Sequence, residues 1–189
     1  ICRGKELSEE YLGIHGTAHS VGIPTNCTML FGTIETVEDR IIHLDRLRVQ
    51  QDGSGGFQCF VPYPYLPDKT RLPEAQLASA NEVIRVIATS RILLDNIPHI
   101  KAYRMNIGDH VASIAINSGA DDIDGTVGHE EIMHEAGSTT RLDYSREEIA
   151  QLVLASGLVP IKRNSTYTSL EFFDAMNRSN LPLPIADQV

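Results

Sequence analysis

The chain has 189 residues, 42% of them apolar, and a formal net charge of −9. This length is enough for one domain with a buried core, and the acidic balance argues against a nucleic-acid-binding face, which needs clustered basic residues. No apolar run approaches the ~20 residues of a membrane span and no secretory signal opens the chain, so we expect a cytoplasmic protein with neither nucleic-acid nor membrane partners.

Helical and strand patterns alternate along the first part of the chain. Apolar residues at helical spacing predict a helix over Ser8–Val21, and the run TNCTMLFG predicts a buried strand over Asn26–Phe31. Apolar residues three and four apart predict a second helix over Glu35–Gln51. The run GGFQCFVP predicts a strand over Phe57–Val61 that ends at Pro62, because proline cannot donate a ladder hydrogen bond.

A long proline-rich loop, PYPYLPDKTRLPEAQ, precedes the next set of elements. A wide apolar stripe predicts a helix over Asn81–Asp95, and the run HIKAYRMN predicts a strand over His99–Met105. A short helix is predicted over Asp109–Asn117, and ADDID reads as a fourth, short strand. Two more helices are predicted over Gly128–Ala136 and Ser145–Ala155, the second from the capping box SREE.

The order of these elements predicts an α/β fold. Short buried strands alternating with helices are typical of parallel βα units, and no Gly-x-Gly-x-x-Gly follows a strand to support a dinucleotide-binding fold. Four βα units are half of an eight-stranded barrel, and a half barrel has two unpaired edge strands. We therefore expect a missing half, or a second copy of the chain, to complete it. The half barrel is predicted over residues 1–167, with LVPIKR as a last short strand, and an irregular tail over 168–189.

The acidic run GADDIDGTVGHEE invites comparison with a calcium loop. In the frames that start at Asp121 and Asp122, acidic residues and glycine do not fall at the required positions, so the comparison fails. In a barrel strand, alternate residues point inward, and functional residues lie at the carboxyl end. Asp122 and Asp124 share one face and Asp121 the other, which makes Asp124 the best candidate to face the barrel mouth.

Two histidine pairs are candidate metal ligands. His129 and His134 are five residues apart, roughly 140° around a helix, and cannot bind one metal from one face. His15 and His19 share a face, but no third ligand lies nearby, so we expect two surface histidines and no metal site.

Several blocks of the chain resemble, in the same order, the C-terminal half of the aminodeoxyfutalosine synthase family. They are HGTAHSVGIPTNCTMLFGTIETVEDRIIHLDRLRVQQDGSGGFQCFVP, LDNIPHIKAYRMNIG and GADDIDGTV. Members are radical S-adenosylmethionine enzymes of the futalosine route to menaquinone. The resemblance implies strands five to eight of a TIM-type (β/α)8 radical S-adenosylmethionine barrel. IPHIKAY and DDIDGTV favour this family over its siblings, cyclic dehypoxanthinylfutalosine synthase and the deazaflavin (FO) synthase subunits, which stay open as alternatives.

The resemblance implies residues beside the cofactor. The fifth strand of the family usually carries Gly-x-Ile-x-Gly-x-x-Glu next to the adenine of S-adenosylmethionine. That pattern falls here on Thr28, Leu30, Gly32 and Glu35. Thr28 departs from the pattern, and Leu30 keeps the apolar contact. On the residues alone, this segment is also what an ordinary strand–turn–helix connection looks like.

Five residues are expected on the substrate side. Asn26, Arg104, Asp124 and Thr126 hold inward or mouth positions of the predicted barrel, and Arg71 in the long loop is expected to close over a substrate carboxylate. The family reaction joins the adenosyl group of S-adenosylmethionine to 3-[(1-carboxyvinyl)oxy]benzoate with loss of a carboxylate. No side chain here is identified as catalytic.

One departure from the family concerns its [4Fe-4S] cluster. Cys-x3-Cys-x2-Cys holds that cluster, and this chain lacks the motif. Cys2, Cys27 and Cys59 are too widely spaced to replace it, and as an odd set they indicate free thiols in a reducing compartment. We therefore expect a fragment that is inactive alone. The alternative from another class is a non-catalytic half-barrel module that binds a ligand or dimerises through its edges.

Overall fold

A computed structural model describes residues 4–67, 72, 74–75 and 77–173. The predicted loop residue Arg71 lies outside them, as do Cys2 and most of the predicted tail. No helix among the described residues is both long and apolar enough to cross a membrane.

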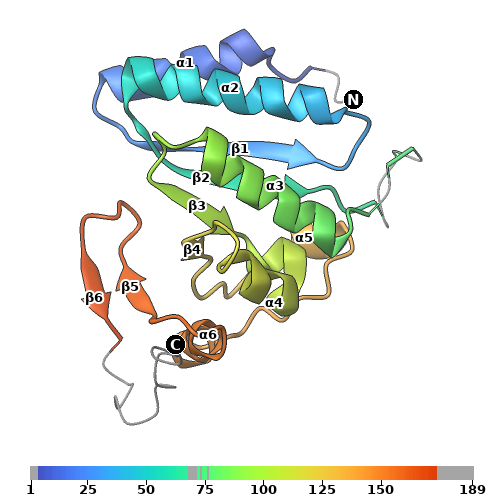
Figure 1. Cartoon of the computed structure of the whole chain (residues 1–189), viewed down its shortest axis with the longest axis vertical. Helices are drawn as coiled ribbons and strands as arrows, with labels where there is room; N and C mark the ends of the chain where they lie inside the picture. Colours follow the sequence, from blue (N-terminus) through green and yellow to red (C-terminus); the bar gives the residue numbers. More distant parts are fainter. Residues whose placement is uncertain (1–3, 68–71, 73, 76, 174–189) are drawn as a thin grey trace, which may run out of the picture.

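Four parallel strands form one sheet in the order β1-β2-β3-β4, as the alternation predicted (Figure 1). They are β1 (Thr25–Phe31), β2 (Phe57–Pro64), β3 (His99–Ala102) and β4 (Asp122–Ile123). Because order follows sequence and all three pairings are parallel, the carboxyl ends lie along one edge of the sheet. β1 and β4 are the two free edges among the described strands.

Helices connect the strands and cover one face of the sheet (Figure 1). Two begin with a complete capping box: Thr36 with Asp39 before α2, and Ser145 with Glu148 before α6, the box that SREE predicted. The helices are α1 (Ser8–Ser20), α2 (Val37–Ser54), α3 (Ala80–Leu93), α4 (Arg104–Ala115), α5 (Ile132–Glu135) and α6 (Arg146–Ala155).

The core lies between the sheet and these helices. Every second residue of β1, namely Cys27, Met29 and Phe31, is buried there against Leu44 and Leu47 of α2. Burial of such side chains stabilises the fold by roughly 1.5–3 kcal/mol each. The opposite face carries the alternate residues, and we call it the inner face; of the helices, the short α5 borders it, through Ile132 and Met133.

β2 continues past Pro62, where the sequence predicted that it would end. The N–H of Tyr65 donates to the carbonyl of Phe31 on β1 at 2.7 Å, so by alternation the nitrogens of Pro62 and Pro64 point away from β1, toward β3. β3 pairs with β2 only at Cys59 and Phe60. The two prolines therefore occupy positions where no N–H is required.

The predicted strand over His99–Met105 is too long. β3 ends at Ala102, and Arg104 already begins α4, because its backbone N–H donates to the carboxylate of Asp124 rather than to a neighbouring strand. α4 bends at Gly108, whose φ of 76° is left-handed. The helix predicted over Gly128–Ala136 is reduced to the short α5.

A two-stranded antiparallel hairpin follows α6. β5 (Ile161–Arg163) was predicted, whereas β6 (Leu170–Phe172) lies within the segment expected to be irregular. Sequence pattern missed β6 because its three side chains are all exposed and show no alternation in burial.

Candidate functional site

The two glycine turns that the sequence singled out lie at the same edge of the sheet. Gly32 directly follows β1, and Gly125 comes two residues after β4. Since the strands are parallel, both belong to the carboxyl rim, where ligand-binding residues of βα folds gather.

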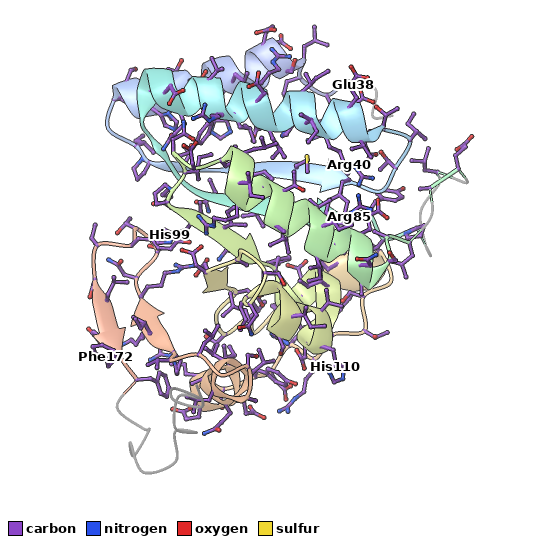
Figure 2. The ribbon with its side chains drawn as sticks, viewed as in Figure 1. Glu38, Arg40, Arg85, His99, His110 and Phe172 are labelled. Atoms are coloured by element: carbon purple, nitrogen blue, oxygen red, sulfur yellow. The ribbon has the colours of Figure 1, made fainter. Side chains whose placement is uncertain are left out.

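The turn after β1 is organised by one carboxylate. Glu35 accepts the N–H of Gly32 at 2.6 Å, the N–H of Thr33 at 2.8 Å and the Thr33 hydroxyl at 2.6 Å. Arg40, labelled in Figure 2, adds an ion pair at 2.7 Å, and it also pairs with Glu82 at 2.8 Å. Gly32 has a left-handed φ of 83°, which favours glycine.

These bonds set the charge state of Glu35. Burial alone raises the pKa of its carboxyl, but the hydrogen bonds from Thr33 and Gly32 outweigh burial and lower the pKa to about 2. The side chain is therefore an anion whose oxygens already bind the turn. In this arrangement Glu35 holds the rim in shape, and the backbone and Leu30 form the exposed part of the turn region.

A groove of about 490 Å³ lies on the inner face at this rim. Thr28 and Leu30 line it from β1, and Leu30 is 56% exposed. Tyr63 of β2 lies beside Leu30 in register, and its ring meets that of Tyr103 edge to face at 5.2 Å. Further lining residues are Pro64, Tyr65, Leu66, Asn106, Glu130, Ile132, Met133 and Ala136.

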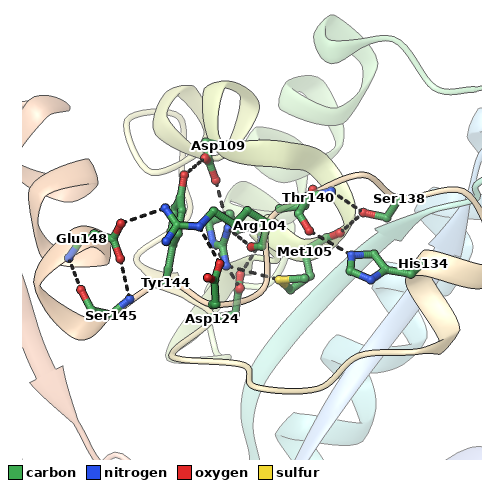
Figure 3. Close-up of polar contacts among 12 residues, drawn as sticks. Arg104, Met105, Asp109, Asp124, His134, Ser138, Thr140, Tyr144, Ser145 and Glu148 are labelled. Carbon is green, nitrogen blue, oxygen red and sulfur yellow. Dashed lines mark hydrogen bonds and ion pairs between the residues drawn. The ribbon is translucent and has the colours of Figure 1, made fainter.

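Arg104 and Asp124 form a buried pair behind this rim (Figure 3). The guanidinium is fully buried, lies 3.1 Å from Asp109, and stacks over the ring of Tyr144 at 4.4 Å. Asp124 is 4% exposed and accepts the backbone N–H of Arg104. Nε of Arg104 and Oδ2 of Asp124 lie 3.5 Å apart, and neither makes a hydrogen bond.

Burial raises the pKa of Asp124, and the Arg104 charge only partly offsets this. The other nitrogens of Arg104 are engaged: Nη1 also donates to the carbonyl of Arg141 at 3.1 Å, and Nη2 contacts the Met105 sulfur at 3.3 Å. The pair thus fixes the start of α4 relative to the end of β4, and its charges are turned away from solvent.

The remaining predicted residues are dispersed. Asn26 is exposed near the amino end of β1, and Thr126 is exposed and lines a different groove, beside α6. The structure therefore brings together Thr28 with Leu30, Gly32 with Glu35, and Arg104 with Asp124.

Sequence reasoning missed the aromatic side of the groove. Tyr63 lies on the inner face with Thr28 and Leu30. The sequence did not indicate it as a site residue, because the predicted strand ends at Pro62. Prolines at the alternate positions 62 and 64 place both missing N–H groups on the same side of a strand. This spacing is the signal that the strand could continue past Pro62.

A second polar cluster joins the hairpin to the inner face. Asp122 binds Lys101 at 2.6 Å, both Nε and Nη2 of Arg163 at 2.6 and 2.8 Å, and the Tyr167 hydroxyl at 2.8 Å. Tyr167 has a left-handed φ of 56°, and its ring stacks on His99 at 4.0 Å. Burial raises the pKa of Asp122, but Arg163 and Lys101 outweigh burial and lower it.

His15 and His19 are not free surface side chains. His15 Nδ1 and His19 Nε2 both lie 2.8 Å from the Thr25 hydroxyl, and His19 Nδ1 lies 2.6 Å from the Ser54 hydroxyl. Both rings also meet the Phe57 ring edge on. Within the described ranges no cluster of three or more His, Cys, Asp or Glu side chains is arranged to hold a metal ion.

The two described cysteines are buried on opposite faces of the sheet. Cys27 lies in the core with Phe31, whereas Cys59 lies on the inner face, next to Asn26 in register. Burial raises the pKa of both thiols, that of Cys59 to about 11, so both remain protonated near neutral pH.

Comparison with known proteins identifies related sequences. The family model described as the CofH/MqnC C-terminal region matches residues 54–176. The chain is 40% identical over 178 residues to an aminodeoxyfutalosine synthase of Thermus thermophilus, with 92% of this chain and 48% of the relative covered. It is 38% identical over 170 residues to a cyclic dehypoxanthine futalosine synthase of Streptomyces coelicolor, with 90% and 42% covered.

A third relative is a 5-amino-6-(D-ribitylamino)uracil–L-tyrosine 4-hydroxyphenyl transferase of Methanothermobacter thermautotrophicus. It is 36% identical over 176 residues, which cover 90% of this chain and 48% of the relative. The chain thus spans about half the length of the curated relatives it matches.

Proposed function

The chain belongs to the family of the CofH/MqnC C-terminal region, and on that premise we propose that it is the carboxyl-terminal half of a radical S-adenosylmethionine barrel. The reaction we propose for the complete protein is that of aminodeoxyfutalosine synthase. It joins the adenosyl group of S-adenosylmethionine to 3-[(1-carboxyvinyl)oxy]benzoate with loss of a carboxylate. The relative of 40% identity carries that name.

The rim beside Leu30 is the observation that supports this proposal most. Thr28 and Leu30 project from β1 into one groove, and the Gly32 turn next to them is held rigid by Glu35. An exposed apolar side chain next to a glycine turn fits the flat face of an adenine, because no Cβ at residue 32 obstructs close approach to the backbone.

S-adenosylmethionine, when bound, supplies the adenosyl group that is transferred. The roles of this chain are to bind and to orient. Leu30 and Thr28 form one wall, the turn of Gly32 and Glu35 fixes the edge of that wall, and the tyrosines of the groove border the space for the second reactant.

On the substrate side we retain Asn26, Arg71, Arg104, Asp124 and Thr126 as candidates. In this proposal, Arg104 and Asp124 hold the start of α4 at the rim. Their charges lie close enough to pair, Asp124 accepts the backbone N–H of Arg104, and the guanidinium donates to Asp109 and to the carbonyl of Arg141.

The described cysteines do not fit a [4Fe-4S] cluster. Cys27 and Cys59 are fully buried, protonated and on opposite faces of the sheet, whereas cluster ligands must be thiolates that converge on one site. We therefore propose that cluster ligation falls to the other half of the complete barrel and that this chain alone is inactive.

The test is reconstitution with a partner half. This chain is co-produced with the part of the Thermus thermophilus relative that precedes the matched region, and the cluster is reconstituted anaerobically. S-adenosylmethionine and 3-[(1-carboxyvinyl)oxy]benzoate are then added, and the product is identified by mass spectrometry. We expect aminodeoxyfutalosine from the pair and none from either part. Leu30→Asp should abolish turnover, while Leu77→Asp, at a similarly exposed leucine outside the groove, should not.

Two results would contradict the proposal. Conversion of dehypoxanthine futalosine, and not of the benzoate ether, would assign the chain to the sibling enzyme. A folded, cluster-containing pair with no turnover of either substrate would favour the non-catalytic module.

A further inference from the structure

On the free edge of β1, one residue, Thr28, already has both its backbone N–H and its carbonyl hydrogen-bonded. In β1, the N–H of Thr25 donates to the carbonyl of Gly56 and the carbonyl of Phe31 accepts from Tyr65, so odd-numbered residues point their peptide groups toward β2. By alternation, Asn26, Thr28 and Leu30 point theirs to the outside, where the described part of the chain adds no further strand to the sheet.

Two side chains bind the Thr28 peptide from outside. The N–H of Thr28 donates to the Tyr11 hydroxyl at 3.2 Å, and His43 Nε2 donates to the Thr28 carbonyl at 2.9 Å. Tyr11 comes from α1 and His43 from α2, so the two atoms that a neighbouring strand would use in the middle of β1 are held by two different helices. The outward backbone groups of Asn26 and Leu30, on either side, form no such bonds with any residue that the structure describes.

We propose that Tyr11 and His43 form a displaceable cap on the β1 edge, and that a parallel strand from the amino-terminal half of the complete barrel displaces it. This rests on the proposed half-barrel function. The partner is a parallel strand because all pairings in this sheet are parallel, and because the chain spans about half of its relatives. A strand that pairs along β1 needs the outward N–H and carbonyl groups of Asn26, Thr28 and Leu30. The cap occupies those of the central residue, Thr28.

The surroundings allow the cap to move. A groove of about 480 Å³ runs beside the edge and is lined by Tyr11, Thr28, Leu30 and His43. α1, which carries Tyr11, has no fully buried residue, and its Tyr11 and Leu12 pack only at the margin of the core, so a shift of Tyr11 leaves the fully buried side chains in place. An uncapped edge strand is a site of unwanted pairing, and side chains that blunt it keep the unassembled chain from associating through this edge.

The first test follows single amides by hydrogen exchange in the chain alone. We expect slow exchange at Thr28 and fast exchange at Asn26 and Leu30. Tyr11→Phe, which keeps the ring and removes the oxygen, should speed exchange at Thr28 about tenfold, the equivalent of one lost hydrogen bond. Tyr65→Phe is the matched control and should leave Thr28 unchanged. Fast exchange at Thr28 in the unsubstituted chain would overturn the cap.

The second test adds the amino-terminal half of the Thermus thermophilus relative. Binding should protect Asn26, Thr28 and Leu30 together, and Thr28 should then be protected with or without the Tyr11 hydroxyl. Tyr11→Phe combined with His43→Leu should tighten association about tenfold, because the cap no longer competes. His110→Leu, on the exposed side of α4, is the control for the histidine change.

Three outcomes would overturn the displacement. In the first, protection of Thr28 in the complex still depends on the Tyr11 hydroxyl. In the second, the two parts do not associate. In the third, the chain without the cap associates with itself through β1 in preference to the partner. No turnover is measured in either test. An inactive but associated pair with a displaced cap would therefore contradict the proposed function and leave this inference standing.

Discussion

At the scale of single residues, Glu35 illustrates how a residue expected beside a ligand can act through the backbone instead. Its carboxylate binds two peptide N–H groups, one hydroxyl and Arg40, whereas the helix begins later, at Val37, because Thr36 is its N-cap. The pattern of residue types predicted the location of this turn, but it did not predict which atoms of the turn remain free.

Glu35→Gln tests this role. The amide keeps an acceptor but loses the charge, so we expect the free energy of unfolding at neutral pH to fall by about 1–3 kcal/mol. Since the pKa in the folded chain is depressed from 4.5 to about 2, the stabilisation is present above the unfolded value and is lost as pH falls through the folded one. Denaturant unfolding of both proteins at several pH values should converge in acid. Glu38→Gln, on the exposed first turn of α2, is the control, and an equal effect there would refute the role of Glu35.

The buried pair of Arg104 and Asp124 is a second residue-scale test. Arg104→Met leaves a buried carboxylate without its cation, and we expect a loss of about 3–5 kcal/mol in the free energy of unfolding. Adding Asp124→Asn should cost less than the sum of the two single changes, because the first change has already broken the pair. Additive losses in thermal or denaturant unfolding would mean that the two residues do not interact.

At the scale of elements, the existence and order of the helices and of every strand except β6 could be predicted from sequence, while their ends depended on contacts between distant residues. Apolar runs such as TNCTMLF are predictive because burial requires them. The end of β3 could not be predicted, since it depends on Asp124 reaching the N–H of Arg104 from another strand. β6 could not be predicted because none of its side chains is buried.

α1 is an element whose attachment should depend on pH. Burial lowers the pKa of His15 and His19, with a further lowering of His15 by His19, so the folded chain favours the neutral rings. Stability therefore rises with pH and is lost as pH falls below the ordinary histidine value through the folded one. The side chains that face the pair are Tyr11, Thr25, Ser54 and Phe57.

We expect the amides of α1 to lose protection between about pH 7 and about pH 5, before those of α2 and α3. His15→Gln combined with His19→Gln should remove this dependence, because burial lowers the pKa of both, whereas His110→Gln should not change it. Hydrogen exchange across this range measures it. A simultaneous loss of protection in all three helices would count against a local effect.

The carboxylate of Asp122 anchors the β5–β6 hairpin to the sheet, beside the stacking of Tyr167 on His99 and a hydrogen bond from Gln58 to the carbonyl of Ser165. Asp122→Asn weakens its contacts with Lys101 and Arg163, and we expect a loss of about 2–3 kcal/mol together with faster exchange over Ile161–Arg163. Glu171→Gln, which breaks only the exposed pair with Lys162, should cost at most about 0.5 kcal/mol. Similar losses for the two changes would show that Asp122 does not anchor the hairpin.

At the scale of the whole molecule, the sheet is bounded by two unlike edges. The β1 edge is capped, whereas β4 pairs only with β3 and lies beside a groove of about 630 Å³ with many apolar residues, among them Ile149, Val153 and Val159. The parallel four-stranded sheet follows the fold class that the sequence predicted; completion of a barrel remains part of the proposal.

Self-association of the isolated chain should therefore proceed through the β4 side. Val159 is 56% exposed in that groove, and Val159→Lys should shift the chain toward monomer in sedimentation experiments. Val49→Lys, at a 62% exposed position on α2, should leave the oligomeric state unchanged. A chain that stays monomeric at high concentration without any substitution would rule out this contact.

The two prolines of β2 have a consequence for the groove. Because neither nitrogen can donate a hydrogen bond toward β3, only the carbonyls of Pro62 and Pro64 are available on that side beyond Val61, and the register of β2 with β3 is confined to Cys59 and Phe60. Tyr63, Pro64 and Tyr103 lie beyond this last pairing and belong to the lining of the rim groove. The covalent structure of two imino acids thus limits the pairing of β2 with β3 along the stretch that borders the rim groove.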